Sequence, residues 1–484
     1  MRSFDPRTGQ PFGDEWPDTG PNELRALCTA AAAAVPYLRE IGPTGRRRLL
    51  AAIAGELEDR RDELVAIADR ETALGPQRLG GELTRTTFQL RFLGEVAADG
   101  GYLRTTIDHP TDSPMGPLPD LRRMMLPIGP VAVFAASNFP FAFSVPGGDT
   151  ASALAAGCPV VVKTHPSHPA TSAAVAAAID HALRRLDAPG GVFATVHGVA
   201  SGRDLVQHPA IKAVAFTGSN RGGRALFDLA CSRPDPIPFY GELGSINPVV
   251  VTSAAAAARL TEIATGWTGS VLLGGGQFCT KPGLLLVPET DRAAFADAAA
   301  EAFAAATPPY LLNQPIRHGY QEGTARLCHA AGTTPPAADD LAGFAAAPTL
   351  HTMTLADALR KPDVLEEVFG PTGIIAGYDD LDAIARMAAA IGGTLTATVH
   401  GEPGDPQAPA LIEILTEISG RVIWNGYPTG VAVSRSMQHG GPWPSSTSVR
   451  HTSVGAAAID RFVRPVSFQS LPEELLPAPL RDHP

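Results

Sequence analysis

The feature that most constrains the fold is an alternation of short apolar runs with helix-like stretches that begins near Arg123. Turns rich in Gly and Pro separate the two kinds of segment. Such short apolar runs are typical of strands buried on both faces, and intervening helices favour parallel pairing. We therefore expect a doubly wound parallel α/β sheet. Its strands are predicted over 131–135, 160–163, 192–196 and 213–216, and its helices over 147–156, 170–186, 204–207 and 221–231.

A second series of the same kind starts near Asn247 and predicts a second α/β unit. The first hundred residues carry apolar side chains at three- and four-residue spacing, which predicts amphipathic helices. The Ala- and Pro-rich stretch 333–348 predicts a surface loop. The strands of the second unit are predicted over 248–251, 284–287, 372–376, 395–399 and 421–424, its helices over 254–265, 292–305 and 381–391, and the N-terminal helices over 23–38, 46–71 and 83–98.

Two segments carry too many helix breakers to belong to either unit. Residues 108–119 include four prolines, and the chain after Asn425 is rich in Gly, Pro, Ser and His. Proline removes a backbone donor and fixes φ, so these segments predict extended arms rather than helices.

Charge and cysteine content exclude several classes of function. Lys plus Arg is 38 and Asp plus Glu is 49, so the net charge is −11. An acidic chain without a basic block argues against nucleic acid and anionic membranes as main partners. No apolar run approaches the roughly 18 residues of a membrane span. The five cysteines are scattered and form no C-x-x-C pair, which argues against a disulfide scaffold or a Cys-based zinc site and predicts a cytoplasmic protein.

Cys279 differs from the other cysteines in its setting. It lies in the segment Gly274-Gly-Gly-Gln-Phe-Cys-Thr-Lys-Pro-Gly283, whose glycines let the backbone approach a ligand closely. A thiol with a pKa near 8.5 is only about 3% thiolate at neutral pH, so a nucleophilic Cys279 needs a base or a cation nearby. The alternative is that Cys279 is a small buried hydrophobe.

Glu242 is a candidate for that base. It lies in Phe239-Tyr-Gly-Glu-Leu-Gly244, where aromatic and apolar neighbours at a strand end would partly desolvate the carboxylate. Desolvation raises the pKa of a carboxylic acid, so we expect the pKa of Glu242 to rise toward the range useful for proton transfer. A surface glutamate at a turn is the alternative.

Polar side chains follow two of the predicted strands. Asn138 comes just after 131–135, where the carboxyl end of a strand faces the ligand crevice, and its amide can donate to an oxyanion. The alternative for Asn138 is an Asx-turn. Lys163 ends the strand 160–163 and either snorkels or contacts phosphate or ribose.

Three further positions have weaker signals. The segment Phe216-Thr-Gly-Ser-Asn-Arg-Gly-Gly223 opens a helix and suits a pyrophosphate, although it is not a general phosphate-binding motif. His165 and His168 lie on a Pro-rich loop with no third ligand, so no metal is expected there. His439, in His-Gly-Gly-Pro-Trp-Pro, is interpreted as part of a loop at a site rim or an interface.

These segments occur in an order that carries further information. The chain contains, in sequence, Ser137-Asn-Phe-Pro140, Lys163, Phe216-Thr-Gly-Ser219, Glu242-Leu-Gly244, Gly276-Gln-Phe-Cys279 and Glu366-Glu-Val-Phe-Gly-Pro371. In content and spacing this series resembles the aldehyde dehydrogenase superfamily over nearly the whole chain. Gly147-Gly-Asp-Thr-Ala-Ser152 and Phe278-Cys-Thr-Lys-Pro-Gly283 are most similar to the branch of α-ketoglutaric semialdehyde and NADP-dependent fatty aldehyde dehydrogenases.

The resemblance implies covalent oxidation of an aldehyde. Cys279 would attack the aldehyde, while the side chain of Asn138 and the backbone N–H of Cys279 hold the oxyanion. After a hydride leaves to the nicotinamide, Glu242 would activate the water that hydrolyses the thioester. The substrate would be a semialdehyde acid such as α-ketoglutaric semialdehyde, or an aliphatic aldehyde.

The resemblance also implies a cofactor site. Lys163 and Glu367 would contact the ribose hydroxyls, Ser219 and Gly218 would lie at the pyrophosphate, and Phe369 at the nicotinamide ribose.

The residue at position 166 bears on whether the cofactor is NADP or NAD. Many NAD-dependent relatives carry Glu three residues after the strand-end lysine, where a 2′-phosphate would be repelled. Here Pro166 replaces the Glu, and Lys163 and His165 offer a cation or a donor, so we expect NADP, with NAD possible.

At position 281 this chain has Lys, where the relatives that it resembles usually have Asn, two residues after the nucleophile. It could lower the pKa of Cys279, anchor an acidic substrate, or point away from the site.

The resemblance further implies the organisation of the chain. A Rossmann-type dinucleotide-binding domain would span 1–105 and 127–244, an α/β catalytic domain 245–435, and an oligomerisation arm and tail 106–126 and 436–484. The expected partners are a small-molecule aldehyde and further copies of the chain in a homodimer or homotetramer. The alternatives are a CoA-acylating aldehyde dehydrogenase, which the retained Glu242 disfavours, and a Cys-dependent acyl hydrolase without redox chemistry.

Overall fold

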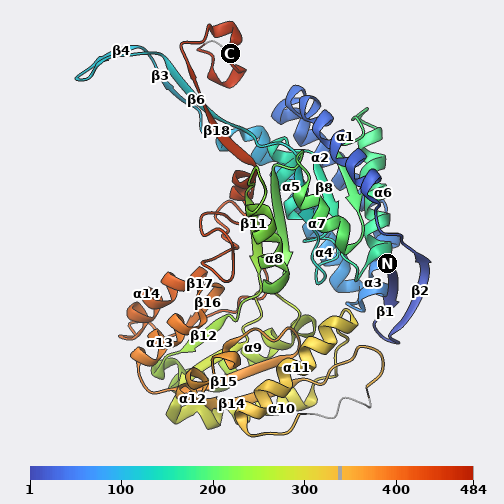
Figure 1. Ribbon diagram of the computed structural model, residues 1–484. Coiled ribbons are helices and arrows are strands. Elements are labelled where there is room, and N and C mark those ends of the chain that lie inside the picture. Colours follow the sequence, from blue (N-terminus) through green and yellow to red (C-terminus); the bar gives the residue numbers. More distant parts are fainter. Residues whose placement is uncertain (336–340, 483–484) are drawn as a thin grey trace.

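Two parallel sheets, each covered by helices, form the body of the molecule, and a thin arm extends from it (Figure 1). The structure is a computed structural model that describes residues 1–335 and 341–482. Residues 336–340, inside the loop predicted over 333–348, and residues 483–484, at the end of the predicted tail, lie outside the described residues.

The first sheet confirms the doubly wound arrangement expected from the first series of apolar runs. Its order is β11-β10-β7-β8-β9, and every neighbouring pair is parallel. Val131 and Val133 of β7 enter one hydrophobic core, whereas Ala132 and Phe134 enter another, because successive side chains point to opposite faces. The strands are β7 (Val131–Phe134), β8 (Val160–Lys163), β9 (Phe193–Val196), β10 (Ala213–Gly218) and β11 (Phe239–Leu243).

Helices cover both faces of this sheet, as the amphipathic patterns predict. The prediction of one helix over 46–71 is wrong, because the chain turns at Arg60 and begins a new helix. That turn lies in a run of charged residues without Gly or Pro, so the sequence gives no stop signal there. The helices are α1 (Pro21–Glu40), α2 (Gly42–Asp59), α3 (Arg61–Thr72), α4 (Pro76–Asp99), α5 (Gly148–Ala156), α6 (Pro169–Arg184), α7 (Val199–Gln207) and α8 (Asn220–Cys231).

The second sheet is also parallel, with the order β14-β15-β13-β12-β16-β17. The predicted strands all appear in it, whereas β14, α11, α12 and α14 are additional to the prediction. The strands are β12 (Pro248–Val251), β13 (Leu284–Pro288), β14 (Thr349–Thr354), β15 (Thr372–Tyr378), β16 (Thr394–His400) and β17 (Ser419–Trp424), and the helices are α9 (Ser253–Leu272), α10 (Arg292–Ala305), α11 (Gln314–Ala331), α12 (Leu355–Arg360), α13 (Leu381–Ile391) and α14 (Ala408–Ile418).

The Pro-rich stretch 108–119 is extended, as predicted. It forms a hairpin at the tip of the arm, and the last long strand of the chain pairs with the arm in an antiparallel sheet (Figure 1). Met115, in the hairpin, is 93% exposed. The strands are β3 (Thr106–Asp108), β4 (Thr111–Ser113), β5 (Gly116–Leu118), β6 (Leu121–Pro127) and β18 (Val463–Gln469), and a separate hairpin at the N-terminus joins β1 (Arg2–Asp5) to β2 (Gln10–Glu15).

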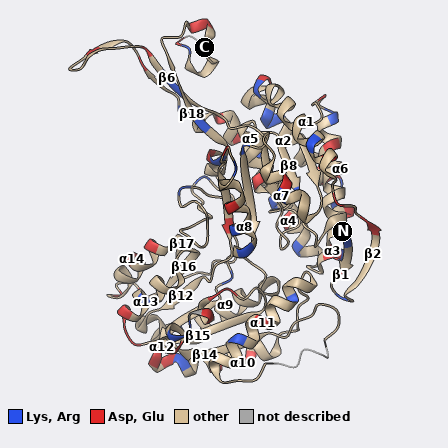
Figure 2. Ribbon diagram, viewed as in Figure 1, with Lys and Arg blue, Asp and Glu red and all other residues tan. Residues whose placement is uncertain are grey.

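Acidic and basic side chains alternate over the outer helices rather than gathering by sign (Figure 2). Among the described residues, no helix is both long and apolar enough to cross a membrane. The loops that leave the carboxyl ends of β7, β8, β10 and β11 meet the second unit along one cleft, which is the edge where an open α/β sheet binds ligands.

Candidate active site

Cys279 lies in the loop between α9 and β13, where a glycine turn fixes its position. Gly274, Gly275 and Gly276 all have positive φ, between 60° and 69°. A Cβ on Gly276 would come 2.0 Å from the carbonyl oxygen of Gly370, so the close approach of these two loops requires glycine there. The turn presents Cys279 half-buried at the cleft.

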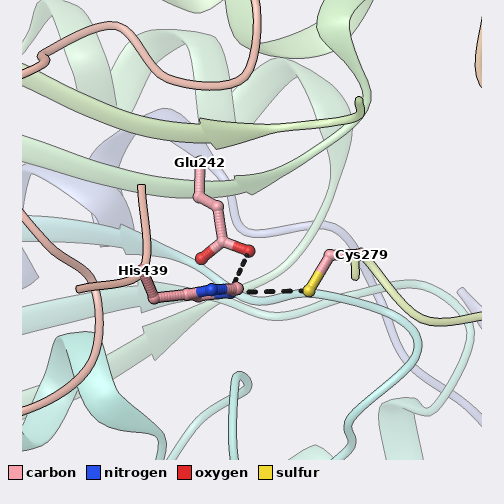
Figure 3. A group of neighbouring side chains, drawn as sticks. All are labelled: Glu242, Cys279 and His439. Carbon is pink, nitrogen blue, oxygen red and sulfur yellow. Dashed lines mark hydrogen bonds and ion pairs between the residues drawn. The ribbon is translucent and has the colours of Figure 1, made fainter. Parts of the chain in front are cut away.

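Glu242, near the end of β11, is held over Cys279 by hydrogen bonds from a distant segment. Its Oε2 accepts from Ser453 Oγ at 2.6 Å, and its Oε1 lies 2.8 Å from Nε2 of His439. The same Nε2 lies 3.5 Å from Sγ of Cys279. Figure 3 shows the imidazole between the carboxylate and the thiol, so the three side chains form one connected group.

The pKa of Glu242 differs from the expectation. Burial alone raises it, but the charge of His439 and hydrogen bonds from His439, Ser453 and Cys279 outweigh burial, so the pKa lies below its usual value. The expected rise is therefore wrong in this arrangement, because the sequence pattern showed the apolar neighbours and not His439.

The thiol of Cys279 shifts in the opposite direction. Burial raises its pKa well above the usual value, and the negative charge of Glu242 raises it further. Formation of the thiolate therefore needs a proton acceptor in contact with sulfur, and Nε2 of His439 occupies that place.

His439 is the functional residue that the sequence interpretation missed. Its side chain is fully buried, its backbone N–H donates to Thr452 Oγ1 at 2.8 Å, and its carbonyl accepts from the backbone of Ser453. The Gly and Pro residues after it indicate a loop but not its position. A buried loop inside a site and an exposed loop at its rim can both be rich in Gly and Pro. The composition of the segment after His439 therefore does not distinguish the two.

Asn138 lines the same cleft as Cys279. It is 7% exposed, and its Nδ2 donates to the carbonyl of Gln277 at 2.9 Å, two residues before Cys279. Arg78 fixes the backbone by donating to the carbonyl of Asn138 at 2.9 Å.

One cleft of about 450 Å³ connects these groups to most of the predicted cofactor residues. Lys163 is not among the described residues that line it, and burial lowers the pKa of its amine. Asn313, Pro315 and Ile316 line the cleft without having been predicted, because the start of α11 was not recognised. The predicted residues that line it are Cys279, Glu242, Asn138, Gly218, Ser219, His165, Pro166, Glu367 and Phe369.

The cofactor side of the cleft offers donors suited to phosphate and ribose. Ser219 caps α8, where its Oγ accepts from the backbone N–H of Gly222 at 3.2 Å, and Gly218 and Ser219, just before the helix, line the cleft. Burial, with the charges of His168 and Lys163, holds the pKa of His165 well below its usual value. His165 therefore offers a neutral ring rather than a cation.

Lys281 points away from Cys279. It is 4% exposed, and its Nζ donates to the carbonyls of Val368 and Gly370, the latter at 2.9 Å. Burial lowers its pKa to about 8, and burial raises the pKa of its neighbour Glu367 to about 7. Lys281 therefore fastens the loop that carries Glu367 and Phe369, and the alternative that it anchors a substrate is wrong.

Comparison with known proteins agrees with this geometry. The family model described as "Aldehyde dehydrogenase family" matches residues 1–309. An α-ketoglutaric semialdehyde dehydrogenase 2 from Azospirillum brasilense is 44% identical, covering 100% of this chain and 93% of that protein. The chain belongs to the aldehyde dehydrogenase family.

A second relative supports this family placement, and solved structures share the fold. An α-ketoglutaric semialdehyde dehydrogenase from Acinetobacter baylyi is 41% identical over 98% of this chain and 91% of its own length. Among solved structures, an NADP-dependent enzyme from E. coli superposes with a TM-score of 0.82 at 22% identity, covering 97% of this chain and 94% of that one. An aldehyde dehydrogenase from Pseudomonas syringae, solved with NAD⁺ and octanal, superposes with a TM-score of 0.81 at 21% identity, covering 97% of this chain and 93% of that one.

The expected fold class is thus confirmed, and this aldehyde dehydrogenase is an NAD(P)-dependent oxidoreductase. The comparisons do not favour the two alternatives, CoA acylation and acyl hydrolysis without redox chemistry. The roles of individual residues rest on the geometry described above.

Proposed function

We propose that this aldehyde dehydrogenase oxidises a semialdehyde acid, α-ketoglutaric semialdehyde first among them, to the carboxylic acid. The observation that carries the chemistry is the connected group of Cys279, His439 and Glu242 at the cleft. The substrate class is supported by two relatives above 40% identity whose names specify this semialdehyde.

Cys279 is the proposed nucleophile. As its sulfur attacks the aldehyde carbon, the thiol proton passes to the lone pair on Nε2 of His439, 3.5 Å away, in the tautomer that carries its hydrogen on Nδ1. The imidazolium that forms then donates from Nε2 to Glu242, which stabilises its charge. The amide of Asn138 and the backbone N–H of Cys279 then hold the oxyanion of the thiohemiacetal.

Hydrolysis of the thioester is the second half of the reaction. Glu242 accepts a proton from water as the water oxygen attacks the thioester carbon, and the sulfur of Cys279 leaves with its electron pair. The depressed pKa of Glu242 keeps the carboxylate ionised and able to accept that proton at neutral pH.

A nicotinamide dinucleotide fits the residues of the cleft. The helix N-terminus at Ser219 suits its pyrophosphate, and the carboxylate of Glu367 suits ribose hydroxyls. When bound, this cofactor supplies the hydride acceptor. We propose NADP as the preferred form, because Pro166 lines the cleft without a repelling carboxylate.

The arm and the tail support two further proposals. We propose that β3 to β6 and β18 join copies of the chain into a homodimer or homotetramer, since Met115 and Leu118 expose apolar surface on the projecting hairpin. We also propose a cytoplasmic location, in keeping with five free cysteines. Light scattering at micromolar concentration tests the first, and a monomer there contradicts it.

A substrate panel tests the function. Purified enzyme is assayed with semialdehyde acids and neutral aldehydes, each with NAD and NADP, and the product is identified by mass spectrometry. We expect the carboxylic acid and a higher kcat/KM for the acids. Acyl-CoA formed on addition of CoA, or no change in nicotinamide absorbance with any aldehyde, contradicts the proposal.

A further inference from the structure

Two arginines lie beside the catalytic group without a carboxylate partner. Arg85, on α4, donates to the carbonyl of Val431 at 3.2 and 3.4 Å and to Gln89 Oε1 at 3.4 Å. Arg421, on β17, donates to the carbonyls of Pro428 at 2.8 Å and Gly430 at 3.1 Å. Among the described residues, no carboxylate lies within 4 Å of either guanidinium.

Both guanidinium groups keep unused hydrogen-bonding capacity. A guanidinium has five N–H donors, and the bonds of Arg85 are all longer than the usual 2.9–3.0 Å or so. The Nε of Arg421 is buried and has no hydrogen-bond partner. Half-buried cations that bond only to neutral groups leave part of their desolvation cost uncompensated, and an anionic ligand would supply the missing partner.

The two arginines converge on one stretch of chain. The carbonyls of Gly430 and Val431 belong to adjacent residues, and one binds Arg421 while the other binds Arg85. The two side chains therefore reach the same short segment, 428–431, from two different elements, α4 and β17.

Contacts link that segment to the catalytic group. The guanidinium of Arg85 lies 5.1 Å from the ring centroid of Phe143, and that ring lies 6.1 Å from the ring of His439. Arg421 Nη1 lies 4.0 Å from the sulfur of Met437, two residues before His439. Burial is the main influence on the pKa of both arginines and lowers it. The charges of Glu82, Cys279 and Glu242 oppose that effect in Arg85, and the charge of Cys279 opposes it in Arg421.

These arginines are separate from the cofactor cleft. Neither is among the described residues that line the cleft with Ser219 and Glu367. Arg78, a third arginine of α4, stacks on the rings of Phe139 and Phe278 and bonds the Asn138 carbonyl, so its role is to support that loop. Arg85 and Arg421 thus lie outside the lining of the cofactor cleft and hold the 428–431 segment.

We propose that Arg85 and Arg421 bind the distal carboxylate of the semialdehyde acid, and thereby select acidic over neutral aldehydes. This inference rests on the proposed function. A guanidinium pairs with a carboxylate in a planar, two-bond geometry, and in a chain of net charge −11 an isolated cationic site also attracts an anion selectively. Since Lys281 points away from the site, these two arginines take the role first considered for it.

The test compares two aldehydes of equal chain length. 5-Oxopentanoate ends in a carboxylate, and pentanal ends in a methyl group. Arg85→Gln and Arg421→Gln are each expected to lower the ratio of kcat/KM for acid to neutral by about 10- to 100-fold, mainly through KM for the acid. Arg85→Lys keeps the charge without the planar fork and should retain an intermediate ratio. Arg360→Gln, on the exposed surface of α12, is the control and should leave the ratio unchanged.

The outcomes distinguish the arginine site from the proposed substrate class. A parallel fall for both substrates, or an unchanged ratio in both Gln variants, overturns the carboxylate site while leaving the semialdehyde function in place. A wild-type enzyme that shows no preference for acids refutes the proposed substrate class, and the arginine site with it. Because Arg421 also holds the 428–430 segment, Arg85→Gln alone decides if the Arg421 variant does not fold.

Discussion

Nε2 of His439 lies 2.8 Å from Oε1 of Glu242, and this contact links the last part of the chain to the sheet that carries the cofactor cleft. The same nitrogen reaches Sγ of Cys279 at 3.5 Å. The imidazole thus connects the group that opens the reaction with the group that closes it. In the proposed mechanism, proton transfer from the thiol and activation of water are therefore coupled through one side chain.

The first prediction concerns this imidazole. His439→Gln should slow aldehyde oxidation by about 10²- to 10⁴-fold, the usual effect of removing a general base. It should also slow alkylation of Cys279 by iodoacetamide at pH 7, because burial and Glu242 hold the thiol pKa high. Peptide mass spectrometry of the alkylated enzyme measures the second effect. An unchanged alkylation rate would mean that His439 only positions Glu242.

The second prediction is that Cys279→Ala abolishes turnover and spares cofactor binding. Loss of a covalent nucleophile removes the reaction path rather than weakening one contact, so activity should fall more than about 100-fold. Fluorescence titration with NADPH should give an unchanged Kd. Cys231→Ala, an exposed cysteine on α8, is the matched control and should retain wild-type turnover. Residual activity above about one hundredth would rule out a thioester on Cys279.

The third prediction separates the two halves of the reaction. Glu242→Gln should slow thioester hydrolysis more than hydride transfer, so stopped-flow absorbance should show a burst of reduced cofactor before a slow steady state. An equal loss in both phases would instead assign Glu242 to thiol activation.

The same variant has a predictable pH effect. The negative charge of Glu242 raises the pKa of Cys279, so replacing it with a neutral amide should lower that pKa. The thiolate then forms at lower pH, and the profile of alkylation rate against pH should move to lower pH. A shift to higher pH would show that Glu242 supports the thiolate rather than opposing it.

The sequence predicted the parallel sheets and most of the cleft because both depend on local patterns. Buried parallel strands read as short apolar runs, and residues after their carboxyl ends meet at one edge by topology alone. Asn138, Ser219 and His165 were found in this way.

The residues that the sequence did not give are those whose roles depend on packing between distant segments. His439 and Ser453 reach Glu242 from some 200 residues away in the chain, and no local pattern marks that contact. The direction of Lys281 is also set at a distance, by the carbonyls of the 368–370 loop. The pKa of Glu242 was misjudged for the same reason, since burial was visible in the sequence and the neighbouring imidazole was not.

The fourth prediction concerns Lys281 and the cofactor loop. Lys281→Met removes the donors to the carbonyls on both sides of Phe369 and leaves them buried, which should destabilise the loop by about 1–3 kcal/mol. KM for the cofactor should rise several-fold, and any change in KM for aldehyde should be the same for acidic and neutral substrates. Lys361→Met, an exposed lysine, is the control. A loss confined to semialdehyde acids would restore Lys281 as a substrate anchor.

The last prediction is that Pro166 sets the preference for NADP. Pro166 lies exposed at the cleft between His165 and Ser167, three residues after Lys163, the last residue of β8. Pro166→Glu would place a carboxylate where the adenosine ribose is expected, and its repulsion of a 2′-phosphate is worth about 1–2 kcal/mol in a partly solvated site. The kcat/KM with NADP should therefore fall about 5- to 30-fold, while that with NAD stays constant or rises, since the new carboxylate can accept from ribose hydroxyls. Glutamine has the size of glutamate without its charge, so Pro166→Gln separates electrostatic repulsion from loss of the proline ring. This variant should change the ratio of kcat/KM for NADP to that for NAD far less. The kcat/KM values for NADP and NAD are measured with one aldehyde at one ionic strength, because salt screens the repulsion between carboxylate and phosphate.

A wild-type enzyme that already favours NAD strongly, or a Pro166→Glu variant with an unchanged ratio of the two values, would show that the cofactor preference is set elsewhere in the cleft.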